Sequence, residues 1–300
     1  MISLCNVTKT FRKDFWSPSF TALDNVSFTI GEGEAIGFLG ANGAGKTTAL
    51  KILFDFIKPN SGKVEFSGTA GKNLSEALGR IGYLPERPYF YPHLTGAEFV
   101  HYMGELTDVS KSDRVQRMQY WAERFKIDHA LGRMIRGYSK GMLQRIGFVS
   151  ILVHNPDILI LDEPLSGLDP IGRKELKDVL REIAKLGKTV FFSSHIVSDI
   201  EEVCKKVVVL EKGALLYEGD IESLLSEHDS KVYELKIRTF AEKLKLENEV
   251  FYEKLYDLHI HRIDGFVSEN VARVLSSGAE IYSLNPLRPS LEQIIYKIRP

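Results

Sequence analysis

Hydrophobic and polar positions alternate along the first two thirds of the chain in a pattern typical of an α/β domain. From Met1 to about Gly219, short apolar runs are separated by amphipathic or polar stretches of helical length. Two runs, Ala35–Leu39 (AIGFL) and Ile158–Leu161 (ILIL), are almost entirely apolar, which is typical of parallel strands that are buried on both faces. We therefore expect a parallel sheet covered by helices.

Helices are predicted between and after these two strands. Thr95 can cap a helix, and residues 115–125 carry apolar side chains at helical spacing. A helix from about 171 to 188 leads into a strand at 189–192, and a second, short helix leads into a strand at 207–210. The chain thus repeats a strand and helix alternation.

A polar cluster (EHDSK) marks a domain boundary, which we place near residue 225. We predict a first domain of residues 1–225 and a second of residues 226–300. The second contains two strand-like runs and two helical runs, so a small α+β domain is expected. These runs are VYELKI at 232–237, EVFYEKLYDL at 249–258, and the helical segments 272–275 and 291–298.

Composition narrows the class of protein. Of 300 residues, 44% are hydrophobic and 26% charged, as in soluble globular proteins. Lys and Arg total 39 against 40 Asp and Glu, so charge gives no reason to expect a nucleic-acid partner. The two cysteines, Cys5 and Cys204, encode neither a disulfide framework nor a zinc site.

No apolar stretch reaches the roughly 18 residues of a membrane span, and no secretory signal precedes the domain, so we expect a cytoplasmic protein.

A phosphate-binding pattern follows the first buried strand. Gly40-Ala41-Asn42-Gly43-Ala44-Gly45-Lys46-Thr47 matches GxxxxGK[ST] and opens a helix. Small residues let backbone N–H groups curl around a phosphate, Lys46 can reach the β and γ oxygens, and the Thr47 hydroxyl can bind Mg²⁺. A plain glycine-rich turn is the structural alternative, but all the parts lie in register.

Two carboxylates follow the second buried strand. Asp162 can hold Mg²⁺ opposite Thr47, while Glu163 can orient or deprotonate an attacking water. A solvated acidic pair is the alternative, but the apolar run leads directly into these residues. The two patterns together predict a nucleoside triphosphate hydrolase.

Further motifs follow a specific order along the chain. Residues 138–142 (YSKGM) open a helix before strand 158–161, residues 166–169 (SGLD) follow the carboxylates, and His195 follows the strand TVFFSS. IGYLPE ends at Glu86, and Phe11 follows the first strand. Over residues 1 to about 220, this order resembles the nucleotide-binding subunit of an ABC transporter.

The resemblance implies a P-loop NTPase fold of the ABC type, with a helical signature subdomain at about 87–155. It implies a head-to-tail dimer around two ATP and Mg²⁺, formed with a second copy or a homologous ATPase subunit. The dimer would power transport through separate integral membrane permease subunits and would lie on their cytoplasmic face. Resemblance to a subset of the family implies that the direction is export. The aromatic stretch RPYFYPHL at 87–94 would line the cleft for those subunits, and the alternative for any single ring is that it fills the core of the helical subdomain itself.

Residue roles are carried over by position. The resemblance implies Glu163 and His195 as catalytic residues and Thr47, Glu86 and Asp162 as metal ligands. It implies nucleotide contacts from Phe11, Ala22, Gly40, Ala41, Asn42, Gly43, Ala44, Gly45, Lys46, Thr47, Thr48, Ser139, Lys140, Gly141, Met142 and Asp169.

Several positions depart from the family pattern. Tyr138, Lys140 and Met142 replace the usual signature residues, and Glu86 replaces the usual glutamine. The adenine-stacking ring is ambiguous, because Phe15, Trp16 and Phe20 lie close to Phe11 in the sequence. We prefer Phe11, which directly follows the first strand. His259 and His261 share one face of a strand without a third ligand, and we interpret them as structural.

Two other functions remain open. One is an ATP-binding regulatory module that dimerises but hydrolyses ATP too slowly for transport. Glu163 argues against it. The other is a soluble ABC-type ATPase that acts on DNA or ribosomes. The single cassette, the balanced charge and the lack of a long insertion between Lys46 and Asp162 argue against that.

Overall fold

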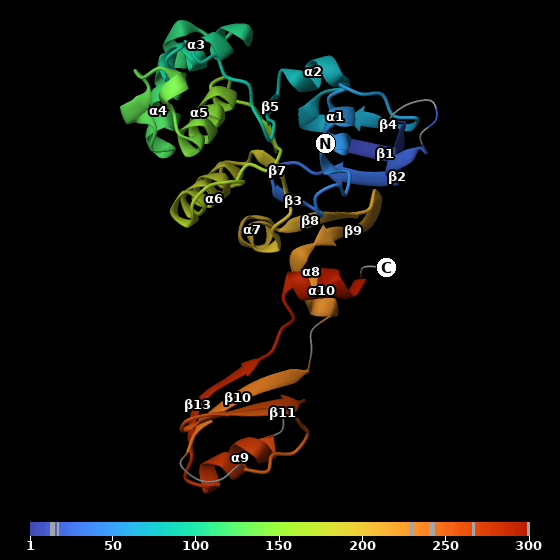
Figure 1. Cartoon of the computed structure of the whole chain (residues 1–300), viewed down its shortest axis with the longest axis vertical. Coiled ribbons are helices and arrows are strands. Elements are labelled where there is room, and N and C mark those ends of the chain that lie inside the picture. The colour runs from blue at the N-terminus through green and yellow to red at the C-terminus, as the bar shows by residue number, and fades with distance from the viewer. Residues whose placement is uncertain (13–15, 17, 229–230, 240–243, 266–267, 299–300) are drawn as a thin grey trace. The chain divides into compact units, whose positions relative to one another are not determined.

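The computed structural model describes residues 1–12, 16, 18–228, 231–239, 244–265 and 268–298 (Figure 1). The chain divides into two compact units, Met1–Ile221 and Glu222–Ile298, and each is described by itself. The boundary predicted near residue 225 falls within helix α8 (Ile221–Glu227).

The first unit contains a three-stranded and a six-stranded sheet. In the six-stranded sheet, neighbouring strands are parallel except for β9, which pairs antiparallel with β8. The predicted strands 35–39 and 158–161 are β3 and β6, and every residue in them is buried. The larger sheet has the order β5 (Ile81–Leu84), β6 (Ile158–Leu161), β7 (Thr189–Ser194), β3 (Ala35–Leu39), β8 (Lys206–Glu211), β9 (Ala214–Asp220). The smaller, antiparallel sheet has the order β2 (Phe20–Ile30), β1 (Ile2–Phe11), β4 (Ser61–Phe66).

One hydrophobic core joins the two sheets. Apolar side chains of β1, β2, β3 and helix α1 (Lys46–Leu53) pack into a single cluster with residues of β6, β7 and β8. Within it, the ring of Phe38 lies 5.2 Å from those of both Phe28 and Phe191, measured between centroids. The loop between β3 and α1 is therefore anchored at both ends in the core.

Helices extend from the larger sheet. Figure 1 shows α3, α4 and α5 gathered into one group, and they pack against one another. Thr95 caps α3 in a reciprocal capping box with Glu98, so this predicted cap is confirmed. The helices of this unit are α1, α2 (Leu74–Leu78), α3 (Gly96–Leu106), α4 (Lys111–Arg124), α5 (Lys140–Leu152), α6 (Pro170–Lys185) and α7 (Val197–Val203).

The second unit has an antiparallel sheet of order β11-β12-β10-β13. The single run predicted at 249–258 is divided, because Tyr256 adopts a φ of +57° in a turn before the next strand. The strand after α9 was not predicted, because its apolar residues are few. The elements are β10 (Val232–Arg238), β11 (Glu249–Leu255), β12 (Leu258–Asp264), α9 (Ser268–Ser276), β13 (Glu280–Pro286) and α10 (Leu291–Ile298).

His259 and His261 are both fully buried in this second unit. The Nδ1 atom of His261 lies 2.7 Å from a carboxylate oxygen of Glu249, and that of His259 lies 3.1 Å from the hydroxyl of Tyr252. Burial lowers the pKa of His259. Within the described ranges, no three His, Cys, Asp or Glu side chains are grouped as a metal site.

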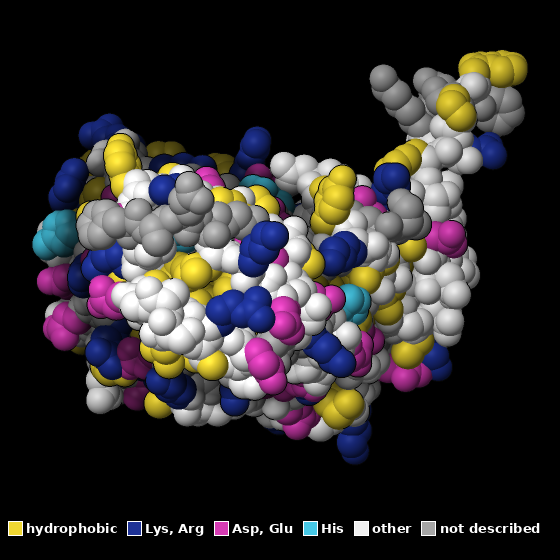
Figure 2. All heavy atoms as spheres, turned by 90° about the horizontal axis from the view of Figure 1, so that it is seen from below, with side chains coloured by type: hydrophobic (Ala, Val, Ile, Leu, Met, Phe, Trp, Pro, Cys, Tyr) yellow, Lys and Arg dark blue, Asp and Glu magenta, His cyan; other side chains and the backbone are white. Residues whose placement is uncertain are grey.

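The surface matches the balanced composition. In Figure 2, basic and acidic side chains intermingle over the visible face, and no region of one sign stands out. None of the helices in the described part of the chain is both long enough and apolar enough to cross a bilayer.

Candidate active site

The loop between β3 and α1 takes its shape from glycine. Gly43 and Gly45 have φ angles of +84° and +110°, in the left-handed region that favours glycine. A Cβ on Gly45 would lie 2.5 Å from the carbonyl oxygen of Ala22, so a side chain there would collide with backbone. The loop thus leads directly into the start of α1, whose first N–H groups lack partners within the helix and can bind a phosphate.

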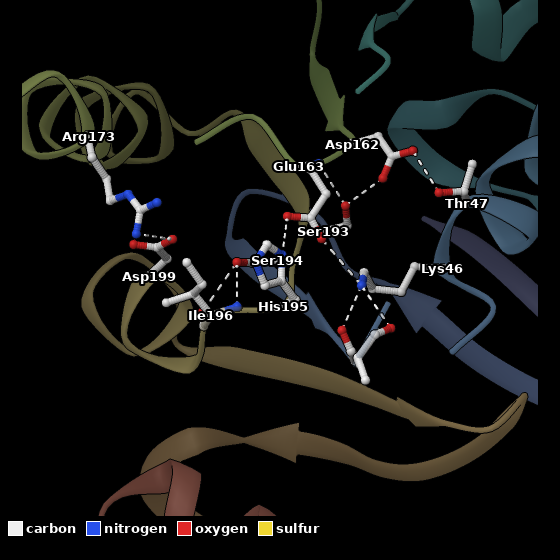
Figure 3. A network of polar contacts seen from close by, with 12 residues as sticks. Lys46, Thr47, Asp162, Glu163, Arg173, Ser193, Ser194, His195, Ile196 and Asp199 are labelled. Carbon is white, nitrogen blue, oxygen red and sulfur yellow. Dashed lines mark hydrogen bonds and ion pairs between the residues drawn. The ribbon is translucent and has the colours of Figure 1, made fainter. Parts of the chain in front are cut away.

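Lys46 is the first residue of α1 and is almost buried, with 6% of its side chain exposed. Its Nζ donates to the carbonyl oxygen of Gly40 at 2.6 Å and lies 3.3 Å from Glu163 Oε1 (Figure 3). A buried ammonium needs such partners because it has lost its water. Phosphate oxygens that enter the loop can replace them.

Asp162 follows β6 and is fully buried. Its Oδ2 accepts a hydrogen bond from the Thr47 hydroxyl at 3.1 Å, and its Oδ1 accepts one from the Ser193 hydroxyl at 2.6 Å. Burial first, and the charge of Asp162 second, raise the pKa of Tyr83 to about 12. The tyrosine is therefore a neutral neighbour of this carboxylate at physiological pH.

Glu163 has an unusual backbone and a shared carboxylate. Its φ is +50°, which is uncommon for a residue with a side chain and is concentrated at functional sites. Its N–H donates to the Ser193 hydroxyl at 2.8 Å, and its Oε2 lies 2.9 Å from Nδ1 of His195. Figure 3 shows Glu163 between Lys46 and His195. Its Oε1 is buried and accepts no hydrogen bond from the described residues, and its partner is the ammonium of Lys46 in the ion pair.

Lys46, Thr47, Glu163 and His195 line a cavity of about 370 Å³, and Asp162, which does not line it, is hydrogen-bonded to Thr47. Glu86, whose carboxylate was predicted as a metal ligand, lines the cavity together with the phosphate loop. Thr47, Glu86 and Asp162 offer a hydroxyl and two carboxylates, which suits Mg²⁺ because it prefers oxygen ligands and retains several waters. The predicted residues that line the cavity are Ala22, Ala41, Asn42, Gly43, Gly45, Lys46, Thr47, Thr48, Glu86, Glu163 and His195.

The structure does not place Phe11 in the lining of this cavity. Phe20 lines it instead. The ammonium of Lys9 lies over the ring of Phe11, 5.2 Å from the ring centroid. The two rings face each other across β1 and β2, so the sequence alone cannot say which one reaches the cavity. The lining thus favours Phe20 for stacking, against our sequence-based preference. Phe15 lies outside the described residues.

The predicted signature residues also lie outside the lining. The Ser139 hydroxyl caps α5 by accepting from the N–H of Met142 at 3.3 Å, and Asp169 caps α6 by accepting from the N–H of Gly172 at 3.0 Å. Lys140 packs against Gly167, where a Cβ would collide with its Nζ. Ser139, Lys140, Gly141, Met142 and Asp169 therefore do not meet the phosphate loop of their own chain.

Two site residues were missed at the level of sequence. Ser193 touches both carboxylate residues, and the buried Gln144 donates from Nε2 to the carbonyl oxygen of Pro164 at 2.8 Å. A serine in a fully buried strand is the signal that could have identified Ser193, because a buried hydroxyl needs partners. Gln144 ties α5 to the loop that follows Glu163.

The sequence is similar to those of known ATP-binding proteins. The ABC transporter family model matches residues 23–166. An ABC transporter ATP-binding protein of Synechocystis is 34% identical over 301 residues, covering 97% of this chain and 82% of that protein. The bacitracin transport ATP-binding protein BcrA of Bacillus licheniformis is 34% identical over 268 residues, covering 89% and 84%.

Solved structures give the same result for the fold. The dimeric structure of MJ0796, a bacterial ABC transporter cassette, superimposes with a TM-score of 0.66 and 26% identity, covering 74% of this chain and 99% of that chain. A second structure, of MJ0796 after hydrolysis and bound to ADP and Pi, has a TM-score of 0.66 at 25% identity, covering the same shares.

Proposed function

This chain belongs to the family of ABC transporter ATP-binding proteins, which are ATPases, and we propose that it dimerises around two Mg·ATP and powers export through separate membrane subunits. The observation that carries the proposal is one cavity lined by Lys46, Thr47, Glu163 and His195, with Asp162 hydrogen-bonded to Thr47. It combines a phosphate cradle, a carboxylate opposite a metal-binding hydroxyl, and a carboxylate paired with a histidine.

Each residue has a physical role in this proposal. The loop N–H groups and Lys46 hold the β- and γ-phosphates. Glu163 accepts the proton of the attacking water, and His195 orients its carboxylate. Mg²⁺ held by Thr47, Asp162 and Glu86 supplies electrostatic stabilisation of the charge on the phosphates when bound. Phe20, rather than Phe11, stacks on the adenine.

The signature residues support a dimer. Because Ser139 and its neighbours do not line the cavity of their own chain, we propose that they complete the site of a second copy. The N-terminus of the 13-residue helix α5 would then face the γ-phosphate held by the partner. The dimeric MJ0796 cassette offers a precedent in a similar fold.

Transport through a membrane partner is supported by similarity to a bacitracin transport ATP-binding protein, and export by the resemblance of the YSKGM signature to a subset of the family. We propose that the chain lies on the cytoplasmic face of the membrane, bound to permease subunits, and that residues 226–300 form an accessory domain. The exposed aromatic side chain of Tyr89, which is 78% accessible, belongs to the stretch proposed to receive those subunits.

Glu163→Gln tests the catalytic part. The amide keeps the shape of the side chain but cannot accept a proton, so ATP hydrolysis should fall at least about 100-fold and ATP should hold the dimer together. Steady-state hydrolysis and size-exclusion chromatography with ATP measure both effects. Glu201→Gln, a change at an exposed position on α7, is the control. Equal hydrolysis by wild type and Glu163→Gln would show that Glu163 is not the base.

Purification from native membranes tests the transport part. Recovery of the chain with integral membrane subunits supports the proposal. Recovery with ribosomes or DNA alone would assign it to a soluble ABC-type ATPase instead.

A further inference from the structure

The hydroxyl of Ser193 makes two hydrogen bonds, each to a different residue of the carboxylate pair. It donates to Oδ1 of Asp162 at 2.6 Å and accepts from the backbone N–H of Glu163 at 2.8 Å. The side chain is completely buried. Both its donor and its acceptor capacity are thus used within the site (Figure 3).

Strand register places Ser193 there. β6 and β7 run parallel with Leu161 opposite Phe192. This register brings the next residue after β6, Asp162, within hydrogen-bond distance of Ser193 on β7. Asp162 and Glu163 lie just beyond the end of β6. The N–H of Asp162 still donates to the carbonyl oxygen of Leu84 on β5 at 2.8 Å, whereas the N–H of Glu163 donates to the side chain of Ser193 on the neighbouring strand β7.

The bond to Glu163 acts on its backbone. Glu163 has a φ of +50°, and a left-handed conformation at such a residue persists only when its surroundings hold it. In this conformation the N–H of Glu163 donates to the hydroxyl of Ser193. Rotation of the backbone to an ordinary φ would break this bond and move the carboxylate away from His195.

The bond to Asp162 acts on the side chain. With Oδ1 engaged by Ser193, Oδ2 is the oxygen that faces the Thr47 hydroxyl. One small hydroxyl therefore determines which oxygen of Asp162 points toward the proposed metal site and where the carboxylate of Glu163 lies.

We propose that Ser193 is a positioning residue for ATP hydrolysis, which sets the geometry of Asp162 and Glu163 together. The inference rests on the proposed role of Glu163. Ser193 does not line the cavity, so we expect no direct contact between Ser193 and ATP. Its loss should therefore lower kcat and leave ATP binding almost unchanged.

Three variants of the full-length chain separate positioning from packing. Ser193→Ala removes the hydroxyl, and Ser193→Cys keeps the side-chain volume but is a poor donor and acceptor. Ser194→Ala is the matched control, because Ser194 carries the next buried hydroxyl on β7, and among the described residues this hydroxyl bonds to the backbone of Ile196 alone. Steady-state hydrolysis gives kcat and KM, and calorimetric titration without Mg²⁺ gives the affinity for ATP.

We expect kcat to fall roughly tenfold or more in both Ser193 variants, with KM and ATP affinity within about twofold of wild type. The decrease in kcat should be much smaller in Ser194→Ala. Wild-type kcat in Ser193→Cys beside a low kcat in Ser193→Ala would assign a packing role and overturn the inference, as would wild-type kcat in both. If Glu163→Gln also hydrolyses ATP normally, the failure lies with the proposed role of Glu163 rather than with Ser193.

Discussion

The ammonium of Lys46 and the carboxylate of Glu163 form an ion pair that is nearly buried, with 3.3 Å between Nζ and Oε1. In the proposed function, phosphate and Glu163 therefore compete for the ammonium of Lys46. Once phosphate oxygens bind Lys46, Glu163 keeps its contact with His195 at 2.9 Å and its Oε1 becomes available to water. Through this ion pair, nucleotide binding at Lys46 would release Oε1 of Glu163, the proposed base.

Removal of the Lys46 charge should abolish this link. In Lys46→Met, the affinity for ATP should fall about 100-fold, because a buried charged partner of the phosphates is lost. Calorimetric titration with ATP measures the change. Lys51→Met, on an exposed position of the same helix, should bind ATP like the wild type. Equal affinities in the two variants would contradict the assignment.

The two facing rings of β1 and β2 give a matched pair of variants. Phe20→Ala should weaken ATP binding by about tenfold, since stacking of a base on an aromatic ring contributes about 1–3 kcal/mol. Phe11→Ala should have little effect, because Phe11 does not line the cavity. Competition by inorganic triphosphate should be unchanged in both. A larger loss in Phe11→Ala would restore the sequence-based preference.

Gln144 should affect both stability and turnover. Gln144→Leu leaves the buried carbonyl oxygen of Pro164 without its donor, which should cost about 1–3 kcal/mol of unfolding free energy. The loop that carries Glu163 should also loosen, so kcat should fall. Urea unfolding and steady-state hydrolysis measure these effects. Gln119→Leu, which removes a hydrogen bond on the exposed face of α4, is the control and should change neither.

Acid stability should depend on His154. Burial, more than nearby charge, lowers the pKa of His154 below its ordinary value of 6.5, while its Nε2 lies 3.2 Å from the carbonyl oxygen of Ile81. The unfolded chain takes up this proton first, so unfolding free energy falls as pH drops from 6.5 toward the lowered pKa. The slope from one proton is at most about 1.4 kcal/mol per pH unit.

His154→Gln removes that titration and keeps a donor for Ile81. Its unfolding free energy should decline less than that of wild type between pH 7 and 5, measured by denaturant unfolding at each pH. Above pH 7.5 the two curves should run parallel, because the imidazole is neutral in both states. Parallel curves over the acid range as well would show that His154 does not titrate as inferred.

Local patterns in the sequence predict many residues of the candidate site. The glycines at 43 and 45, with Lys46 and Thr47, are dictated by the path of one loop, and Asp162 and Glu163 follow an apolar strand. Such features depend on neighbours in the chain, so residue type and spacing are sufficient to predict them. The buried strands 35–39 and 158–161 and the Thr95 cap were predictable for the same reason.

Contacts between distant segments could not be predicted in this way. Phe11 and Phe20 are equivalent by residue type, and only the fold directs one of them into the cavity. Ser193 meets Asp162 because β6 and β7 pair in one particular register, and Gln144 meets Pro164 because α5 packs beside that loop. The sequence by itself determined which chemistry the chain contains. The tertiary structure decided which side chains hold that chemistry in place, because strand register and helix packing bring together residues whose types alone do not select a partner.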